Sequence, residues 1–531
     1  MKVVPEADRP VTQSPGVPEP SPAAAGTGLG RFAVPGLVAT LAAGLVLRFF
    51  TTSDLWLDEA LTVNIAELPL DQLHEALRQD GAPPLYYVLL HGWINLFGSG
   101  DLAARSLSGI ASVATLPLIW FAGRRLGGRT VGWSAVALLA SSPFAVRYAT
   151  EARMYALQML FVVGGYLALV RALESPRLPR LALVGAVTGA LLYLQYWSLY
   201  LVAVVGAVLV FRSWRSSTLL QRQASRSVLV AVVAGCITFL PWVPTFLYQS
   251  VHTGTPWGGR VFPSSAFIMA LVDFAGGAYS DGYTLLLPLL LLAVLGVFGR
   301  ATGAGRIELD LRTRPRARWE AFVFLAALLL GMAAAYVGGT TFQGRYAAFV
   351  FPLFVLLAAC GVAVFADRRV RAAVLVVIVG LGLVGSARTA LRNRTQAEEV
   401  ADVITAEARP GDVVGYCPDQ VAPDASRLIG DEPGLEHLTY PRAEGPELID
   451  WVDYQERVDA ADPAAFAALL LERADPDGTV WLVSSPGYRN FDNGQCEAIV
   501  AALGAERPGA VRSRPESIFF ESMGLSEYPP P

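Results

Sequence analysis

The stretch "VPGLVATLAAGLVLRFF" (residues 34–50), followed directly by "TTSDLWLDEALTV" (residues 51–63), decides the fold class. The first run is long and apolar enough to cross a membrane as a helix. The second places Asp54, Asp58 and Glu59 where that helix meets water. A single acid at such a boundary is most simply explained as a solvated side chain, but ionisable groups close to the bilayer often have a function. The question is therefore what these carboxyl groups do.

The composition predicts a polytopic membrane protein that is mainly α-helical. Of the 531 residues, 53% are hydrophobic and only 16% are charged, and the mean hydropathy is +0.45. Apolar stretches of spanning length recur between short charged loops, which is typical of a chain that crosses the bilayer many times. The net charge of −4 gives no indication of a nucleic-acid partner.

The spans and their direction follow from hydropathy and from the distribution of arginine. We predict about eleven transmembrane helices. They are centred near 33–50, 106–122, 131–146, 156–170, 181–195, 197–211, 228–247, 283–299, 320–337, 346–366 and 372–387. The arginine-rich loops fall on alternate connections, so we expect all of them in the cytoplasm. This predicts a multi-pass protein of the plasma membrane with a cytoplasmic N-terminus and an extracytoplasmic C-terminal domain.

Three parts are expected along the chain. Residues 1–30 are rich in Pro, Ala and Ser, which predicts a disordered cytoplasmic tail. Residues 31–390 form the membrane domain, and its first extracytoplasmic loop, residues 51–105, has the pattern of two interfacial helices. The segment 83–98 is apolar but too short to span. If it did cross, every later arginine-rich loop would move to the outside.

Residues 391–531 are more polar and predict a small extracytoplasmic α/β domain. Helices are expected at 395–408, 463–474 and 494–505, and strands at 412–417, 479–485 and 517–522. Alternating elements of this kind favour a parallel or mixed sheet. The segment carries no Gly-rich phosphate motif, so we expect a domain that covers the mouth of the site or helps to hold an acceptor. Cys417 and Cys496 both lie in it and are expected to form a disulfide outside the cytoplasm.

Carboxyl groups converge on the predicted outer face of the membrane domain. Separate outer segments place an acid within a few residues of the bilayer: Asp58 with Glu59, then Asp80, then Glu151. Convergence of this kind favours a functional site over acids that are merely solvated.

Arginines lie beside these acids. Arg147, Arg153 and Tyr155 flank Glu151, and Arg345 with Tyr346 begins a later span. Arginine at this depth is costly unless it pairs with an anion. A guanidinium holds phosphate oxygens through paired hydrogen bonds, so a lipid phosphate is the expected ligand.

An ordered set of motifs carries a family resemblance. The motifs are "LWLDEALTV" (55–63), "DGAPPLYYVLLHGWINLFG" (80–98), "DLAARSLSGIASVATLPLIWFAGRRLGG" (101–128), "SSPFAVRYATEARMYAL" (141–157) and "GRYAAFVFP" (344–352). The sequence resembles the GT-C membrane glycosyltransferases of the protein O-mannosyltransferase type (glycosyltransferase family 39), and in particular their actinobacterial members. It is also similar to the bacterial transferase that adds aminoarabinose to lipid A. The resemblance covers roughly residues 35–175 and extends more weakly to about residue 360.

The resemblance implies a GT-C fold and an inverting transfer of a sugar from a polyprenyl-monophosphate donor to an acceptor outside the cytoplasm. Asp58 matches the catalytic base of the family. Asp80 and Glu151 match two further acids, and Arg345 matches a basic residue near the donor phosphate. The C-terminal segment does not match the tripartite repeat domain of eukaryotic protein mannosyltransferases, which leaves lipid, glycan and protein acceptors open. The sugar is mannose or another pentose or hexose.

The chemistry fits these residue types. An acceptor hydroxyl needs a carboxylate to take its proton, and we assign this role to Asp58. The phosphate gains charge as it leaves, and fixed arginines stabilise that charge. The expected phosphate-binding residues are Arg345, Arg153, Arg147, Tyr155 and Tyr346. The residues expected to orient the acceptor or the base are Glu59, Asp80 and Glu151.

Two alternatives stay open. No cofactor is required, but a divalent metal held by carboxylates with His74 or His91 is an alternative, although no metal-ligand spacing is present. A non-catalytic polyprenyl-lipid-binding or transport protein is the second. We interpret the outer loop with His252, Trp257 and Arg260 as an ordinary connection.

Overall fold

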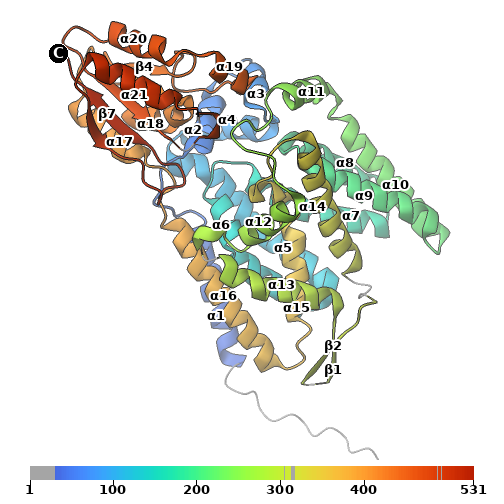
Figure 1. Ribbon diagram of the computed structural model, residues 1–531. Helices are drawn as coiled ribbons and strands as arrows, with labels where there is room; N and C mark the ends of the chain where they lie inside the picture. Colours follow the sequence, from blue (N-terminus) through green and yellow to red (C-terminus); the bar gives the residue numbers. More distant parts are fainter. Residues whose placement is uncertain (1–29, 281, 304, 313–316, 487, 492) are drawn as a thin grey trace, which may run out of the picture.

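The computed structural model describes residues 30–280, 282–303, 305–312, 317–486, 488–491 and 493–531. The expected tail at 1–30 lies outside these residues, except for Gly30, with which the first helix begins. The membrane domain is a bundle of helices, and the C-terminal domain caps one end of it (Figure 1). The start of α1 (Gly30–Leu47) and the hairpin of β1 (Gly299–Gly303) and β2 (Arg306–Leu309) lie at the opposite end.

Each of the predicted spans coincides with helical structure. Six helical segments of the described chain are long and apolar enough to cross a membrane, and the remaining spans are shorter apolar helices. After α1, the spanning elements are α5 (Asp101–Ala140), α7 (Tyr155–Glu174), α8 (Leu178–Leu194), α9 (Ser198–Arg215), α10 (Leu219–Ile237), α13 (Gly282–Phe298), α14 (Arg318–Gly338), α15 (Phe351–Val362) and α16 (Arg368–Ala390). The long α5 contains two of the predicted spans, because Gly127 and Gly128 leave the helical conformation and Gly128 adopts φ +85°.

The connection between α1 and α5, which the sequence predicts to be the first extracytoplasmic loop, holds three short helices. They are α2 (Leu57–Glu67), α3 (Leu73–Asp80) and α4 (Leu85–Phe97). The sequence predicted two helices here. Pro69 forces Leu68 into an extended conformation (ψ 151°), so α2 ends at this point and α3 is a separate helix. With 13 residues, α4 is about 20 Å long and cannot cross a hydrocarbon core of about 30 Å.

Three further helices lie in connections of the bundle that the sequence predicts to be outside the cytoplasm. They are α6 (Pro143–Ala149), α11 (Val243–His252) and α12 (Pro263–Phe274). Short 3₁₀ turns at 240–242, 278–280 and 344–349 join the neighbouring helices. Residues 344–349, which contain the "GRY" motif, therefore enter α15 through a turn and not as part of its helix.

The C-terminal domain has a five-stranded mixed sheet in the order β4-β3-β5-β7-β6. Its strands are β3 (Val413–Cys417), β4 (Glu436–Thr439), β5 (Val480–Ser484), β6 (Ala510–Ser513) and β7 (Gly524–Tyr528). The helices around it are α17 (Ala397–Glu407), α18 (Ala422–Ile429), α19 (Tyr454–Ala460), α20 (Pro463–Arg473) and α21 (Gln495–Glu506). β3 runs parallel to β4 and β5, whereas β7 runs antiparallel to β5 and β6.

One predicted strand is wrong. Residues 517–520 form turns, and the strand begins seven residues later than expected, at Gly524. Phe520 of this segment instead packs edge-on against Trp56 of the membrane domain, with ring centroids 5.1 Å apart. The segment is therefore a contact between domains and not part of the sheet.

The C-terminal domain rests on α2. The backbone N–H of Leu57 donates to Glu521 Oε2 (2.9 Å), so a side chain of one domain caps the first turn of a helix of the other. Further along α2, Arg427 donates to Asn64 Oδ1 (2.6 Å) and to Glu67 Oε2 (2.9 Å). These contacts fix the start of α2, where the acids at positions 58 and 59 lie.

Candidate active site

Asp58 lies in the first turn of α2 and faces two arginines. Its Oδ2 is 2.9 Å from Arg345 Nη1 and 3.8 Å from Arg153 Nη2. The side chain of Asp58 is 21% exposed, compared with 0% for its neighbour Glu59, so Asp58 is the acid that a reactant can reach. Arg153 also donates to Asp58 O (3.1 Å) and to Thr62 Oγ1 (2.6 Å), which ties the loop at 150–154 to α2.

Aromatic rings surround Arg345. Its guanidinium carbon lies 5.6 Å from the ring centre of Trp56, 5.5 Å from that of Trp257 and 5.6 Å from that of Tyr346. Tyr346 in turn stacks on Trp197, with centroids 5.0 Å apart and an interplanar angle of 14°. Burial alone would lower the pKa of Arg345, but the charge of Asp58 outweighs it and raises that pKa. The residue is a permanent cation held at a fixed position.

Hydrogen-bonding groups without a partner gather around this ion pair. Trp56 Nε1, Arg153 Nε, Tyr155 Oη and Arg345 Nε are buried and find no hydrogen-bond partner within the described part of the chain. Buried polar groups left unpaired cost free energy. A site with several unpaired donors next to two guanidinium groups suits an oxygen-rich anion.

Asp80 ends α3 and lies on the Arg153 side of the site. Its Oδ2 accepts a hydrogen bond of 2.7 Å from Tyr87 Oη. Burial raises the pKa of Asp80, while the positive charge of Arg153 opposes that shift. The Asp80 carboxyl group thus lies close enough to Arg153 and Asp58 to interact with both charges.

Glu59 and Glu151 belong to a buried ionic cluster beneath the site. Arg105 Nε and Nη2 donate to Glu59 Oε1 and Oε2 (2.8 and 2.7 Å), and the N–H of Ala152 donates to Oε1 (2.8 Å). Arg394 Nη1 lies 3.4 Å from Glu59 Oε2 and 3.8 Å from Glu151 Oε1. Burial would raise the pKa of Glu59, but the charges of Arg105 and Arg394 with these hydrogen bonds lower it. The cluster joins α2, α5, the end of α6 with the loop at 150–154, and the linker after α16.

Arg147 faces this cluster and not Asp58. Its Nε lies 3.0 Å from Glu151 Oε1, and its guanidinium carbon lies 5.6 Å from the ring centre of Phe520. Tyr155, by contrast, lies at the start of α7 close enough to Arg345, Arg153 and Asp58 for electrostatic interaction. Of the predicted phosphate-binding residues, the structure therefore groups Arg345, Arg153, Tyr155 and Tyr346 around Asp58, and Arg147 with Glu151.

Several residues of the site were not predicted. Trp56 directly precedes the "LDEA" motif, and its indole at the predicted membrane boundary could have indicated that it belongs to the site. Trp257 lies on a loop that we interpreted as an ordinary connection, yet it contacts Arg345. Arg394 follows the last span and carries no local pattern that links it to residue 59. Gly344 is required for packing, because a Cβ there would lie 1.8 Å from Asp273 Oδ2.

Two remaining predictions concern cysteines and metal. Cys417 at the end of β3 and Cys496 at the start of α21 form a disulfide, with an S–S distance of 2.05 Å. Among the residues that the structure describes, no group of three or more His, Cys, Asp or Glu side chains could hold a metal ion. His74 bonds Thr245 (3.1 Å) and His91 bonds Ala66 O (2.8 Å), so both histidines have other partners.

Comparison with known proteins gives one family and a set of structures. Residues 81–242 match the family described as dolichyl-phosphate-mannose-protein mannosyltransferase. The crystal structure of ArnT from Cupriavidus metallidurans in the apo state has a TM-score of 0.59 at 13% identity, covering 93% of this chain and 98% of that one. The structure of the same protein bound to undecaprenyl phosphate has a TM-score of 0.57 at 14% identity with the same coverage.

A more distant similarity is to the Archaeoglobus fulgidus oligosaccharyltransferase complex with Zn and sulfate, with a TM-score of 0.48 and 9% identity over 90% of this chain and 72% of that one. No curated protein sequence matches the chain. The expected resemblance and the GT-C fold with a small C-terminal sheet domain are confirmed.

Proposed function

We infer the reaction from the premise that this chain is a membrane glycosyltransferase of the GT-C class, as its family match and its fold indicate. We propose that it transfers a sugar, mannose or another pentose or hexose, from a polyprenyl-monophosphate donor to an acceptor outside the cytoplasm. In this proposal the configuration at the sugar carbon inverts and Asp58 is the general base. The acceptor is a lipid, a glycan or a protein.

One observation carries the proposal: Asp58 and Arg345 form an ion pair amid buried donors that have no partner in the described chain. Without donor, the Asp58 carboxylate neutralises Arg345. A phosphate brings oxygens that satisfy Arg345 and the free N–H and O–H groups of Arg153, Trp56 and Tyr155. It therefore competes with Asp58 for Arg345 and releases the carboxylate to act as a base once the donor is bound.

The transfer then needs two contributions from the protein. Asp58 takes the proton of the acceptor hydroxyl as the new bond to the sugar forms, which typically accelerates such reactions about 10²–10⁴-fold. As the bond between the sugar carbon and the phosphate oxygen breaks, charge builds on the phosphate. Arg345 and Arg153 are already in place to stabilise it. These residues supply both contributions, and we assign no step to a metal ion.

The other acids have distinct roles in this scheme. Asp80, held by Tyr87 near Arg153, is suited to orient the acceptor hydroxyl toward Asp58. Glu59 and Glu151 act indirectly, since their carboxylates are bound by Arg105, Arg147 and Arg394. The buried cluster keeps α2 and the loop at 150–154 at the separation that places Asp58 against Arg153.

Support for the donor class comes from the relatives. The matched family is described by a dolichyl-phosphate-linked donor, and ArnT, which shares this fold, was crystallised with undecaprenyl phosphate. For this chain we propose residues 31–390 as the catalytic membrane domain and 391–531 as an extracytoplasmic domain that covers the site. A cytoplasmic N-terminus in the plasma membrane agrees with the arginine distribution, and the disulfide suits an oxidising compartment.

The test is donor turnover by the purified full chain in liposomes. The protein is supplied with polyprenyl-monophosphate sugars, radiolabelled in the sugar, and with membrane lipids or glycans as acceptors. We expect acceptor-dependent loss of the sugar-lipid and release of polyprenyl phosphate. Binding of the donor without turnover would indicate a lipid-binding protein, and passage of intact donor across the bilayer would indicate a transporter.

A further inference from the structure

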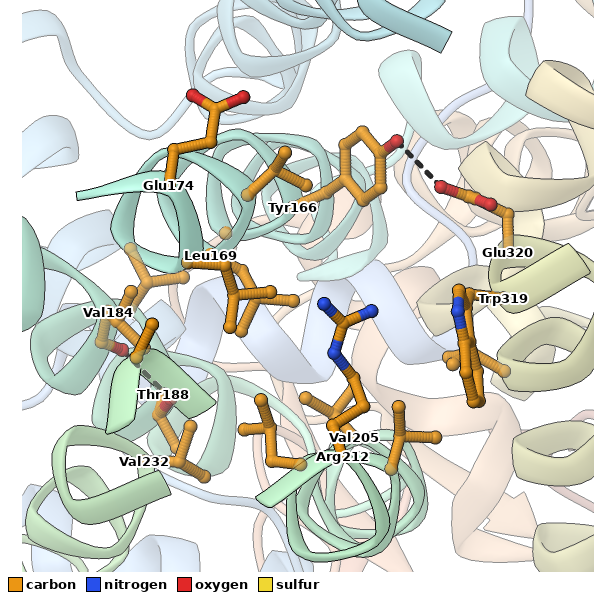
Figure 2. Close-up of a pocket in the computed structure, with 18 of the residues that line it drawn as sticks. Tyr166, Leu169, Glu174, Val184, Thr188, Val205, Arg212, Val232, Trp319 and Glu320 are labelled. Carbon is orange, nitrogen blue, oxygen red and sulfur yellow. Dashed lines mark hydrogen bonds between the residues drawn. The ribbon is translucent and has the colours of Figure 1, made fainter. Parts of the chain in front are cut away.

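A second site lies at the other end of the membrane domain. A cavity of about 1210 Å³ is lined mainly by residues of α5, α7, α8, α9, α10 and α14 (Figure 2). Its polar residues sit at the helix ends that adjoin the arginine-rich connections: Glu174 ends α7, Arg212 is in the last turn of α9, and Glu320 is in the first turn of α14. Within the described chain, none of the residues around Asp58 lines this cavity.

The walls are apolar and their depth matches one leaflet of a bilayer. Along α9 the lining runs from Leu201 to Arg212, which corresponds to about 16 Å of helix rise. One leaflet contributes about 15 Å to a hydrocarbon core of about 30 Å. Valine and leucine side chains, among them Val184, Val205 and Val232, cover the wall (Figure 2). The cavity thus has the length and the surface that a lipid chain of one leaflet requires.

The polar end of the cavity presents an unpaired donor and an unpaired acceptor. Arg212 Nε and Glu320 Oε2 are buried, and the described residues provide neither with a hydrogen-bond partner. Figure 2 shows the Arg212 guanidinium projecting into the cavity beside Trp319, with Glu320 opposite and hydrogen-bonded to Tyr166 (2.8 Å). Arg212 Cζ lies 5.9 Å from the Trp319 ring centre. A ligand that satisfies both atoms must supply an acceptor to Arg212 Nε and a hydrogen-bond donor to Glu320 Oε2, and charged groups of opposite sign do so with the strongest hydrogen bonds.

The charges at this end balance. Arg125 pairs with Glu174, and Arg212 faces the cavity with Glu320. Two guanidinium groups and two carboxylates therefore line the mouth, and a head group with no net charge but both signs fits them best. A guanidinium binds phosphate oxygens, and a carboxylate accepts hydrogen bonds from an ammonium group.

We propose that this cavity binds a phospholipid of the leaflet on the arginine-rich side, with a head that carries both a phosphate and an ammonium group, as in phosphatidylethanolamine. The phosphate lies on Arg212, the ammonium on Glu320, and an acyl chain fills the apolar part. The tail of a donor whose phosphate lies at Asp58 would leave Arg212 Nε and Glu320 Oε2 unpaired, at a cost in free energy. The proposal does not depend on the reaction at Asp58.

The experiment is photo-crosslinking of the full chain in liposomes. Phosphatidylethanolamine and phosphatidylglycerol, each with a diazirine in the acyl chain, are compared, and labelled peptides are mapped by mass spectrometry. We expect the ethanolamine lipid to label the cavity segments of α7 and α9. Arg212→Gln or Glu320→Gln should reduce that labelling about tenfold, as expected for the loss of a charge-assisted hydrogen bond. Arg215→Gln, at an exposed position in the same turn of α9, is the matched control and should leave labelling unchanged.

Three results would overturn the proposal. Equal labelling by phosphatidylglycerol would show that the cavity does not select the head group. Labelling that is unchanged in both the Arg212 and the Glu320 variant would show that these side chains do not bind it. The third result is that undecaprenyl phosphate competes with the lipid for labelling of the unaltered protein but not of Arg345→Gln. This would show that the cavity is an extension of the donor site. The lipid comparison in the unaltered protein needs no variant, so it decides the question even if a substitution impairs folding.

Discussion

Arg345 Nη1 lies 2.9 Å from Asp58 Oδ2, although the two residues come from opposite ends of the membrane domain sequence. The neighbouring acid Glu59 points the other way, into a cluster with Arg105 and Arg394. Two adjacent positions of α2 therefore differ in environment. Asp58 is partly exposed and pairs with Arg345 among buried donors that have no partner in the described chain, whereas Glu59 is fully buried in an ionic cluster. The two should respond differently to the same substitution.

Asp58→Asn should abolish transfer while the protein stays folded. The amide keeps the shape of the side chain but cannot take the proton of the acceptor, so we expect the turnover number to fall about 10²–10⁴-fold. The change is measured as acceptor-dependent release of polyprenyl phosphate by purified protein in liposomes. Binding of polyprenyl phosphate should persist or tighten, because Arg345 loses its competing carboxylate.

The control for this variant is Glu67→Gln. Glu67 ends the same helix and pairs at the surface with Arg427, so its loss should leave turnover within about twofold. Full turnover in Asp58→Asn would end the assignment of Asp58 as the base.

Arg345→Lys should impair donor use although it keeps the charge. Lysine cannot hold two phosphate oxygens with a planar fork, and the ring contacts with Trp56 and Trp257 suit a guanidinium. We expect KM for the donor to rise at least about tenfold, the equivalent of one charge-assisted hydrogen bond. Arg345→Gln should lower the turnover number as well, since the charge that stabilises the leaving phosphate is gone.

The matched variant is Arg260→Gln, an exposed arginine on the outer loop that carries Trp257. If Arg260→Gln and Arg345→Gln weaken the donor equally, a general electrostatic attraction explains the effect and a specific phosphate site at Arg345 is excluded.

Glu59→Gln should lower the stability of the folded protein and not only the rate of transfer. The carboxylate of Glu59 is fully buried and neutralises Arg105 and Arg394, so the amide leaves buried positive charge without a partner. Breaking a buried ion pair from one side typically costs about 3–5 kcal/mol. Thermal unfolding in detergent, followed by loss of the monodisperse peak, should occur at a clearly lower temperature than for Asp58→Asn. Equal melting of the two variants would contradict the structural role.

Much of the fold could be predicted because the bilayer imposes simple rules. Apolar length located the spans, and the predicted spans coincide with helices. The short helices between α1 and α5 were predicted less accurately. Leucines continue at helical spacing past Pro69, so the sequence pattern did not show that α2 ends there. The strand expected at 517–522 is wrong, and Phe520 of that segment contacts Trp56 of the membrane domain instead, which no local pattern predicts.

The site was predictable only where local motifs mark it. Asp58, Asp80 and Arg345 each sit in a recognisable motif, so their convergence could be proposed. Arg394 has no such mark, because its role arises from tertiary contact with Glu59, Glu151 and Thr150. The separation of Asp58 from Glu59 into different environments also depends on packing, since both lie in the same turn of α2.

Removal of the disulfide should destabilise the C-terminal domain. Cys417 and Cys496 are separated by 79 residues, and closing a loop of that length destabilises the unfolded chain by about 4.5 kcal/mol in the chain-entropy model. Replacing both cysteines by serine should lower the protection of β3 and β5 against hydrogen exchange. Protection in the spans should stay the same, and Cys236 of α10 and Cys360 of α15 serve as controls for the serine substitution. Unchanged exchange in both strands would show that the sheet does not depend on this bond.

Asp419 should make the stability of the C-terminal domain depend on pH. Burial raises the pKa of Asp419 to about 7, while the hydrogen bond from Tyr454 Oη opposes that shift. In the unfolded chain the carboxyl group loses its proton at about pH 4, so between these values the folded state binds more protons. The free energy of unfolding should therefore fall as the pH rises from about 4 to about 7, and level off above that. Asp419→Asn keeps the shape and never ionises, so its hydrogen-exchange protection in β3 should decline less over that interval than in the unaltered protein. A parallel decline in both proteins would assign the pH dependence to other groups, such as the neighbouring carboxyl pair of Asp424 and Glu521.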